Sequence, residues 1–331
     1  MLDTFAYNKH NTSQFILFYS CPTEEPLKKL IGLIALVAIL VVIVLGYGRQ
    51  DNRDRDTHKE ANIISTESSA RGAPPKTSCP YTFISWNIAN FGRKKTDEEI
   101  ALIAKVLAHA DIVAVQEVVA GKEFGAQAIA KLALALGRTG AAWDYTVSDP
   151  TRPPSAGVER YAYLWKRHTM TVNRDNARLV QELQASVDRE PYALLFQPKE
   201  SAPLYVFSVH TVPVAKQPIR EVEALVSAKE VRAVKRAIIA GDFNLSRKKA
   251  DPLFARIGFT GHITASTSLR GFVGRNGYRS RQYDNVYTKD LRVCTAGVID
   301  FVGTYFAPVT DESLRNARHL SDHLPVFVTF R

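Results

Sequence analysis

The chain has 331 residues, of which 46% are hydrophobic, and a formal net charge of +10. Its length allows one large or two modest domains, and its apolar content is ample for a buried core, so a disordered protein is excluded. The basic excess favours an anionic partner such as nucleic acid, phospholipid or inositol phosphate, although such an excess also keeps a surface soluble or draws it to a membrane.

The first element in chain order is an apolar segment, Leu30–Gly48, with 19 residues and no charge. It is long enough to cross a hydrocarbon core of about 30 Å, so we predict a single transmembrane helix over 30–48. The alternative is a cleaved signal peptide, but the apolar run is longer than usual and no clear cleavage site follows it. Basic residues flank both ends, so charge does not fix the orientation. We expect the globular domain on the periplasmic or extracellular side.

With this predicted anchor, the chain has four parts. We predict a polar N-terminal segment at 1–29, the transmembrane helix at 30–48, a flexible linker at 49–79 and one globular domain at 80–331. The linker is charge-alternating and then rich in Ser, Thr and Pro, without hydrophobic periodicity. The domain contains 34 Lys and Arg residues against 25 Asp and Glu residues, so it carries nine of the ten net positive charges.

Short apolar runs bounded by polar residues recur along the domain, a pattern typical of buried strands that present ligand-binding groups at their ends. The runs are Phe83–Asn87, Ile112–Glu117, Ala162–Trp165, Leu204–His210, Ala237–Ala240, Tyr283–Tyr287 and a last run that begins at Leu324. The segments around Tyr163, Leu194 and Val206 follow one another without a helical pattern between them. We therefore predict an α/β domain with a mixed sheet.

Three stretches between these runs have the apolar spacing of helices. They are Asp97–His109, Phe124–Leu136 and Pro218–Val234. Thr96, followed three positions later by Glu99, predicts a capping box at the start of the first helix.

Two cysteines belong to the domain or its border, Cys79 and Cys294. They could form a disulfide if the domain is exported, but two solitary cysteines in a sequence more often have no such role.

The polar residues at the strand ends are acids, amides and imidazoles, and they could meet at one place. A carboxylate that accepts one ring proton of a histidine fixes the tautomer of the other ring nitrogen, so His210 and His323 among acids indicate general acid–base catalysis. Hard oxygen ligands without matching thiols favour Mg²⁺, with Mn²⁺ or Ca²⁺ as alternatives. A metal, imidazoles and a basic surface together predict attack of water on a phosphodiester.

Eight motifs follow one another along the domain. They are Trp86–Gly92, Gln116-Glu117-Val118, Glu159-Arg160-Tyr161, Arg189-Glu190-Pro191, Val209-His210, Gly241-Asp242-Phe243-Asn244, Tyr283-Asp284 and Ser321–Val326. In this order the chain from about residue 81 to the C-terminus resembles the endonuclease/exonuclease/phosphatase superfamily, and within it the deoxyribonuclease I branch. The resemblance implies an α/β (α+β) four-layer sandwich of two packed mixed β-sheets flanked by helices, with a cleft at one end of the sheets. In this chain the sandwich is preceded by the one transmembrane helix predicted from the apolar segment.

The resemblance also implies ligands for a divalent cation and for the substrate phosphate. Glu117 would hold the metal, with Asn87 and Asp322 assisting. Asn244 and Arg189 would each hold a phosphate oxygen and stabilise charge that builds in the transition state. Taken singly, the two asparagines could equally be turn residues at strand ends.

The acid–base groups come from the same motifs. The resemblance implies that His210, paired with Glu159, and His323, paired with Asp284, flank the scissile phosphate as general base and general acid, in an order that the sequence leaves open. Asp242 would orient water or a histidine. A lone histidine is more often structural than catalytic, but eight ordered motifs favour the catalytic interpretation.

The sequence departs from the deoxyribonuclease I branch where that branch inserts an arginine and a tyrosine into the minor groove of DNA. These positions are Val119 and Gly157 here, which puts minor-groove binding in doubt. Other basic residues could contact phosphates instead or could lie in solvated loops. They are Arg275, Arg279, Arg281 and the run Arg247-Lys248-Lys249.

Three functions are compatible with these features. The first is a membrane-anchored, metal-dependent endonuclease that cuts DNA with little sequence preference. RNA could be an additional substrate, and no obligate protein partner is expected. The second is a phosphoesterase of the same superfamily that acts on sphingomyelin or phosphoinositide head groups, for which the anchor gives a reason. The third is an inactive binding module, against which the intact acid–base set argues.

Overall fold

A computed structural model describes residues 79–121, 124–152 and 157–331. The predicted N-terminal segment, the predicted transmembrane helix and the predicted linker up to residue 78 lie outside the described residues. Across the described ranges, no helix is both long enough and apolar enough to span a membrane.

The first sheet has six strands in the order β14-β15-β1-β2-β4-β3. Its strands β1 and β2 are parallel and the other neighbours are antiparallel, so the sheet is mixed, as predicted. The strands are β1 (Tyr81–Phe91), β2 (Ile112–Val119), β3 (Trp143–Val147), β4 (Glu159–Lys166), β14 (Val293–Val298) and β15 (Val326–Phe330).

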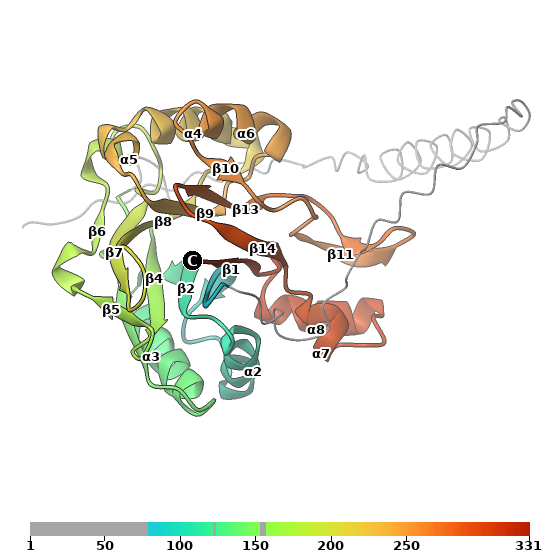
Figure 1. Ribbon diagram of the computed structural model, residues 1–331. Coiled ribbons are helices and arrows are strands. Elements are labelled where there is room, and N and C mark those ends of the chain that lie inside the picture. Colours follow the sequence, from blue (N-terminus) through green and yellow to red (C-terminus); the bar gives the residue numbers. More distant parts are fainter. Residues whose placement is uncertain (1–78, 122–123, 153–156) are drawn as a thin grey trace, which may run out of the picture. The chain divides into compact units, whose positions relative to one another are not determined.

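The second sheet has seven strands in the order β10-β13-β9-β8-β7-β5, with β6 also paired to β7, and it is mixed because β8 and β9 are parallel. Its strands are β5 (Met170–Val172), β6 (Arg178–Leu179), β7 (Tyr192–Pro198), β8 (Leu204–His210), β9 (Ala237–Asp242), β10 (Thr260–Gly261) and β13 (Asp284–Lys289). A separate hairpin of β11 (Leu269–Gly274) and β12 (Gly277–Arg279) reaches away from the two sheets (Figure 1).

Helices cover the outer faces of both sheets (Figure 1). On the side of the first sheet lie α2 (Asp97–Leu107), α3 (Phe124–Gly137), α7 (Phe301–Tyr305) and α8 (Asp311–Leu320). On the side of the second sheet lie α4 (Pro218–Ser227), α5 (Lys229–Ala233) and α6 (Arg247–Ala255). Three short 3₁₀ turns occupy Arg174–Asn176, Gln181–Leu183 and Val214–Lys216.

The strands bury both faces, and alternate side chains therefore enter different cores. In β1, Phe83 lies in the core between the sheets, whereas the next residue, Ile84, lies in the core under α2, α3 and α8. In β9, Ile238 lies between the sheets and Ile239 lies under α4 and α6. Three buried cores thus separate four layers, helices, sheet, sheet and helices, which is the sandwich expected from the sequence.

One predicted helix differs from the observed structure. The predicted helix Pro218–Val234 is divided into α4 and α5, because Ala228 between them has a non-helical backbone conformation (φ −58°, ψ 131°). The Glu182 carboxylate accepts hydrogen bonds from the N–H groups of Lys229 (3.2 Å) and Glu230 (2.7 Å), so a distant side chain caps a new helix start. By contrast, the capping box of Thr96 and Glu99 is confirmed.

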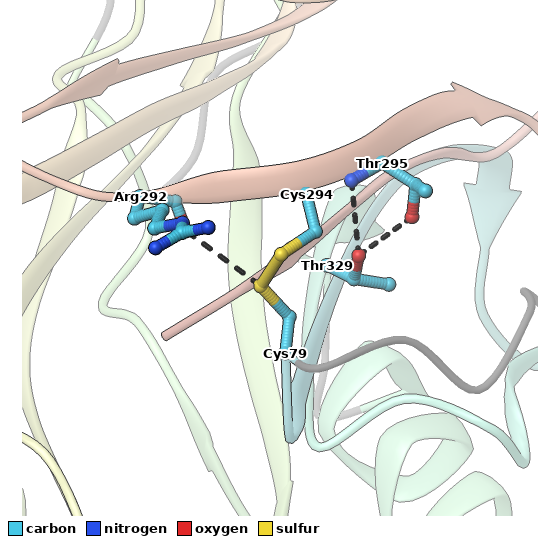
Figure 2. Close-up of a disulfide and its surroundings, with 5 residues drawn as sticks. All are labelled: Cys79, Arg292, Cys294, Thr295 and Thr329. Atoms are coloured by element: carbon cyan, nitrogen blue, oxygen red, sulfur yellow. Dashed lines mark hydrogen bonds between the residues drawn. A yellow bond between two sulfur atoms is a disulfide. The ribbon is translucent and has the colours of Figure 1, made fainter.

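Cys79 and Cys294 form a disulfide that closes a loop of 215 residues (Figure 2). Cys294 lies at a register shift between β14 and β15, where Val293 and Thr295 pair with successive partners on the neighbouring strand. The Thr329 hydroxyl accepts a hydrogen bond from Thr295 N–H (3.1 Å) at this irregularity (Figure 2). Because one extra residue bends a bulged strand, the bulge directs Cys294 toward the start of β1.

Replacing both cysteines with alanine is expected to lower the free energy of unfolding by about 3 kcal/mol, because the unfolded chain loses a long cross-link. Denaturant unfolding of the wild-type chain and of the Cys79→Ala/Cys294→Ala variant measures the change. A reducing agent should destabilise the wild type by a similar amount and leave the variant unchanged. Equal stability of the two proteins under oxidising conditions would contradict a closed disulfide.

Candidate active site

Strand pairing places three of the predicted site residues in one row across the second sheet. His210 at the end of β8 pairs with Asp242 at the end of β9, and Asp242 pairs with Asp284 at the start of β13. The close approach of β8 and β9 requires glycine at position 241, where φ is +145° and an added Cβ would lie 1.8 Å from Val209 O. Gly241 therefore allows the row to form.

Gly241→Ala is expected to lower the free energy of unfolding by about 3 kcal/mol or more, because alanine must push β8 and β9 apart. Gly137→Ala is the matched control, since a Cβ at the end of α3 meets no atom within 4 Å. Chemical denaturation of both variants tests this. A Gly241→Ala protein as stable as the control would show that the two strands can separate without cost.

Glu117 reaches the site through a β-bulge. The pairing register between β2 and β4 shifts between Val115 and Val118, and Glu117 adopts a left-handed backbone conformation (φ +59°). Non-glycine residues rarely adopt such a conformation, and bulges re-aim side chains next to functional sites. Glu117 Oε2 accepts a hydrogen bond from Asn90 N–H (3.0 Å), and Oε1 accepts one from Asn87 Nδ2 (3.0 Å).

His210 is held by a buried carboxylate. Its Nδ1 lies 2.8 Å from Glu159 Oε1, and its backbone N–H donates to the Tyr161 hydroxyl (3.2 Å). Burial lowers the pKa of His210, but the charges of Glu159 and Asp242 more than offset this effect, so the pKa lies above its usual value. The Glu159 contact leaves Nε2 to face the cavity.

His323 has the same arrangement on the other side. Its Nδ1 lies 2.7 Å from Asp284 Oδ2, and that oxygen also accepts a hydrogen bond from the Thr267 hydroxyl (2.6 Å). Burial opposes the charged imidazole, but Asp284 and Asp242 raise the pKa of His323 to about 10. Burial also raises the pKa of Asp284, so the pair as a whole retains a proton at neutral pH.

Asp242 lies between the two imidazoles. Its Oδ2 is 3.7 Å from Nε2 of His210 and 3.7 Å from Nε2 of His323. The same oxygen lies 3.3 Å from Nδ2 of Asn87 and 3.3 Å from Nδ2 of Asn244, and both amides donate to it. One buried carboxylate thus organises both histidines and both amides.

The Asn87 side chain has a free acceptor beside Glu117. Asn87 is fully buried, its Nδ2 donates to Glu117 and Asp242, and its Oδ1 has no hydrogen-bond partner among the described residues. A buried acceptor without a partner is costly, and a cation would satisfy it. Asp322 lines the same cavity, with a side chain that is 42% exposed and lies 3.7 Å from Arg318 Nη2. Oxygen donors of this kind fit a hard divalent cation.

A second set of ligand atoms is present nearby. Asp242, Asp284 and His323 each place one atom within 4.8 Å of the others, so these three residues could hold a metal ion instead. However, Asp284 Oδ2 and His323 Nδ1 already share a short hydrogen bond. A metal bound to these two atoms would replace that bond, whereas a metal at Asn87 and Glu117 would satisfy an unpartnered atom.

Arg189 makes contacts that the sequence did not predict. Its Nε and Nη2 donate to the backbone oxygens of His210 (3.1 Å) and Thr211 (2.9 Å), and Nε lies 3.4 Å from Glu159 Oε1. Arg189 therefore fixes the end of β8 and the carboxylate that holds His210. Its Nη1 makes no hydrogen bond within the described ranges. Asn244, which donates to Thr211 O (3.1 Å), lies at the same edge.

Eight of the ten predicted residues line one cavity of about 430 Å³, and the other two, Asn87 and Asp284, are hydrogen-bonded to residues that do. The eight are Glu117, Glu159, Arg189, His210, Asp242, Asn244, Asp322 and His323. The structure thus brings all ten together at one end of the two sheets. Val119 and Gly157 also line this cavity. They occupy the two positions at which the sequence departs from the arginine and the tyrosine of the deoxyribonuclease I branch.

Three residues that support the site were not predicted from the sequence. Thr267 orients Asp284, as described above. Ser321 Oγ donates to Asn87 O (2.6 Å) and accepts from His323 N–H (2.9 Å), so it joins β1 to the last motif. Lys95 Nζ donates to Leu320 O (2.8 Å), and burial lowers its pKa although the Glu99, Glu117 and Asp322 carboxylates oppose this. Only Ser321 belonged to a recognised motif, and nothing local in the sequence marks the other two.

Two histidines, each held by a buried carboxylate and presenting its other ring nitrogen to one cavity, have the arrangement of a general acid–base site. Comparison with protein families then identifies the chain. The model of the Endonuclease/Exonuclease/phosphatase family matches residues 84–323, so the chain belongs to this family, whose members are phosphoesterase hydrolases. This confirms the superfamily resemblance seen in the sequence. A comparison with curated proteins gave no match.

Solved structures share the fold at low sequence identity. A family protein from Leptotrichia buccalis is 15% identical over 76% of this chain and 99% of its own, with a TM-score of 0.52. A mannosyl-6-phosphatase from Bacteroides thetaiotaomicron is 16% identical over 76% of this chain and 99% of its own, also at 0.52. A humanized D. rerio TDP2 is 16% identical over 76% of this chain and 98% of its own, again at 0.52. At these identities the likeness concerns the fold alone.

Proposed function

We propose that this protein is a membrane-anchored, divalent-metal-dependent endonuclease that hydrolyses DNA phosphodiester bonds with little sequence preference. The observation that carries the proposal is the pair of imidazoles around Asp242. Each has Nδ1 held by a buried carboxylate and Nε2 3.7 Å from the same Asp242 oxygen, at a cavity that is open to solvent.

The two imidazoles divide the proton transfers of the reaction. One Nε2 takes a proton from the attacking water, and the other gives a proton to the oxygen of the leaving group. Glu159 and Asp284 hold the rings in the required tautomers. Asn244 and the free Nη1 of Arg189 donate to the non-bridging phosphate oxygens as negative charge builds there.

Glu117 is proposed to hold the metal, with Asn87 Oδ1 and Asp322. Bound there, a cation such as Mg²⁺, or Mn²⁺ or Ca²⁺ in its place, supplies charge that polarises the phosphate. The protein's own contribution is to keep Glu117 in place through Asn90 N–H and to turn the Asn87 amide toward it.

The charge of the domain supports nucleic acid as the substrate. Its 34 basic residues exceed its 25 acidic residues, although four carboxylates line the catalytic cavity. The basic excess therefore lies outside the cavity, where it can attract a polyanion. The disulfide supports an exported domain, because such bonds persist in oxidising compartments.

One observation favours a second candidate, a phosphoesterase that acts on lipid head groups. Val119 and Gly157 leave the cavity without the two side chains that would enter a minor groove, so a small head group could reach the histidines. The predicted anchor at 30–48 would keep such an enzyme at its substrate.

Incubation of the purified chain with supercoiled plasmid and Mg²⁺ separates these candidates. We expect nicking that disappears with EDTA and in the His323→Ala variant. Release of head groups from sphingomyelin or phosphoinositide vesicles, without nicking, would support the lipid enzyme instead. If the folded chain shows neither activity, the inactive binding module becomes the remaining hypothesis.

A further inference from the structure

A second cavity adjoins the catalytic cavity. It has a volume of about 380 Å³, and Asn244 lines both cavities. The two are also neighbours along the chain, because Pro213 lines the first and Val214 the second. A ligand bound in the catalytic cavity can therefore extend past Asn244 into the second.

The second cavity has the opposite charge character. Four carboxylates line the catalytic cavity, whereas no carboxylate is found among the described residues that line the second. Lys249 of α6 and Arg281, which precedes β13, supply two positive charges. The start of α6 at Ser246 also lines it and adds the partial positive charge of a helix N-terminus.

The ion pairs distinguish these two cations from two basic residues nearby in the sequence. Arg247 is bound to Asp251 (2.5 Å) and Arg279 to Asp300 (2.9 Å). Across the described ranges, the side chains of Lys249 and Arg281 make no hydrogen bond or ion pair, and both are exposed. Two unpartnered cations that share one cavity suit an anion with several acceptor oxygens, such as a phosphate.

We propose that this cavity binds the phosphate next to the scissile one in a nucleic acid strand. The inference rests on the proposed nuclease function and specifies its substrate, since an ester with a single phosphate has no second phosphate to place there. Val214, Ile219 and Tyr283 also line the cavity and offer a surface for a sugar or a base. Such a surface favours a nucleotide over an inositol ring, whose hydroxyl groups need polar partners.

The test compares two substrates of the full-length chain. A single-stranded oligonucleotide has neighbouring phosphates, whereas bis(p-nitrophenyl) phosphate is a phosphodiester without one. Lys249→Gln/Arg281→Gln is expected to lower kcat/KM on the oligonucleotide about tenfold or more and to reduce the salt dependence of binding by about one counterion per lost contact. Hydrolysis of bis(p-nitrophenyl) phosphate should stay within about twofold of the wild type.

Lys248→Gln/Arg275→Gln is the matched control, because it removes the same charge, one residue from α6 and one from the turn between β11 and β12, at residues that do not line the cavity. An equal loss in the control would overturn the inference, since net charge alone would then explain it. A loss on bis(p-nitrophenyl) phosphate would overturn it as well, because the two residues would then act at the scissile phosphate. A loss confined to a soluble phosphoinositide would assign the cavity to a lipid head group and overturn it too.

Failure of the proposed function gives a different result. If the wild-type chain hydrolyses neither substrate, the nuclease proposal itself fails and the inference falls with it. If it hydrolyses both at the same rate as the Lys249→Gln/Arg281→Gln variant, only the second phosphate site is rejected.

Discussion

His323→Ala and His210→Ala are each expected to lower kcat for plasmid nicking by about two orders of magnitude or more, with the fold intact. Each imidazole presents one free nitrogen to the cavity, and loss of a positioned acid or base typically costs this much. Because both rings take part in one reaction, we expect the double variant to be little slower than the slower single variant.

His168→Ala is the control, because His168 is exposed and lies in the turn between β4 and β5, outside the cavity. Single-turnover rates at saturating DNA measure the chemical step, and circular dichroism checks the fold. A rate near that of the wild type in either site variant would show that the histidine is structural and would remove the acid–base mechanism.

The site could be predicted from the polar residues at the strand ends because sheet geometry is regular. Parallel neighbours such as β8 and β9 end at the same edge, so His210 and Asp242, each at the end of an apolar run, had to be adjacent. Asp284 joins them because β13 runs antiparallel and begins where β9 ends. The short continuous apolar runs predicted buried strands, and these strands are indeed buried on both faces.

The irregular features could not be predicted in the same way. The bulge that turns Glu117 into the cavity depends on a backbone conformation that glutamate rarely adopts, so only tertiary contacts such as the Asn90 N–H bond can hold it. The break at Ala228 depends on Glu182, which is 46 positions away in the chain. The disulfide depends on a bulge at Cys294, and cysteine spacing does not reveal such a bulge.

Arg189 shows a further limit of motif reading. The sequence placed it correctly at the cavity, but two of its three nitrogens, Nε and Nη2, already contact backbone oxygens, and Nε also faces Glu159. An arginine has five N–H donors, so one residue can position a strand end and still contact substrate. A motif locates such a side chain without showing which of its donors are already occupied.

Glu117→Gln is expected to remove metal binding, with at least a 100-fold loss of Mg²⁺-dependent activity, since even outer partners of a ligand change metal affinity 10–100-fold. Glutamine keeps the length of the side chain and one oxygen but lacks the negative charge. The decisive readout does not need activity. Metal at about 100 times its dissociation constant should stabilise the wild type against unfolding by about 2.7 kcal/mol, and this gain should be lost in the variant.

The same measurement decides between the two sets of ligand atoms. If the cation is held by Asp242, Asp284 and His323, Glu117→Gln retains the stabilisation by metal and Asp284→Asn loses it. We expect the reverse, because Asn87 Oδ1 beside Glu117 lacks a partner, whereas Asp284 already shares a hydrogen bond with His323. Asp97→Asn, a change at an exposed carboxylate at the start of α2, should behave as the wild type does.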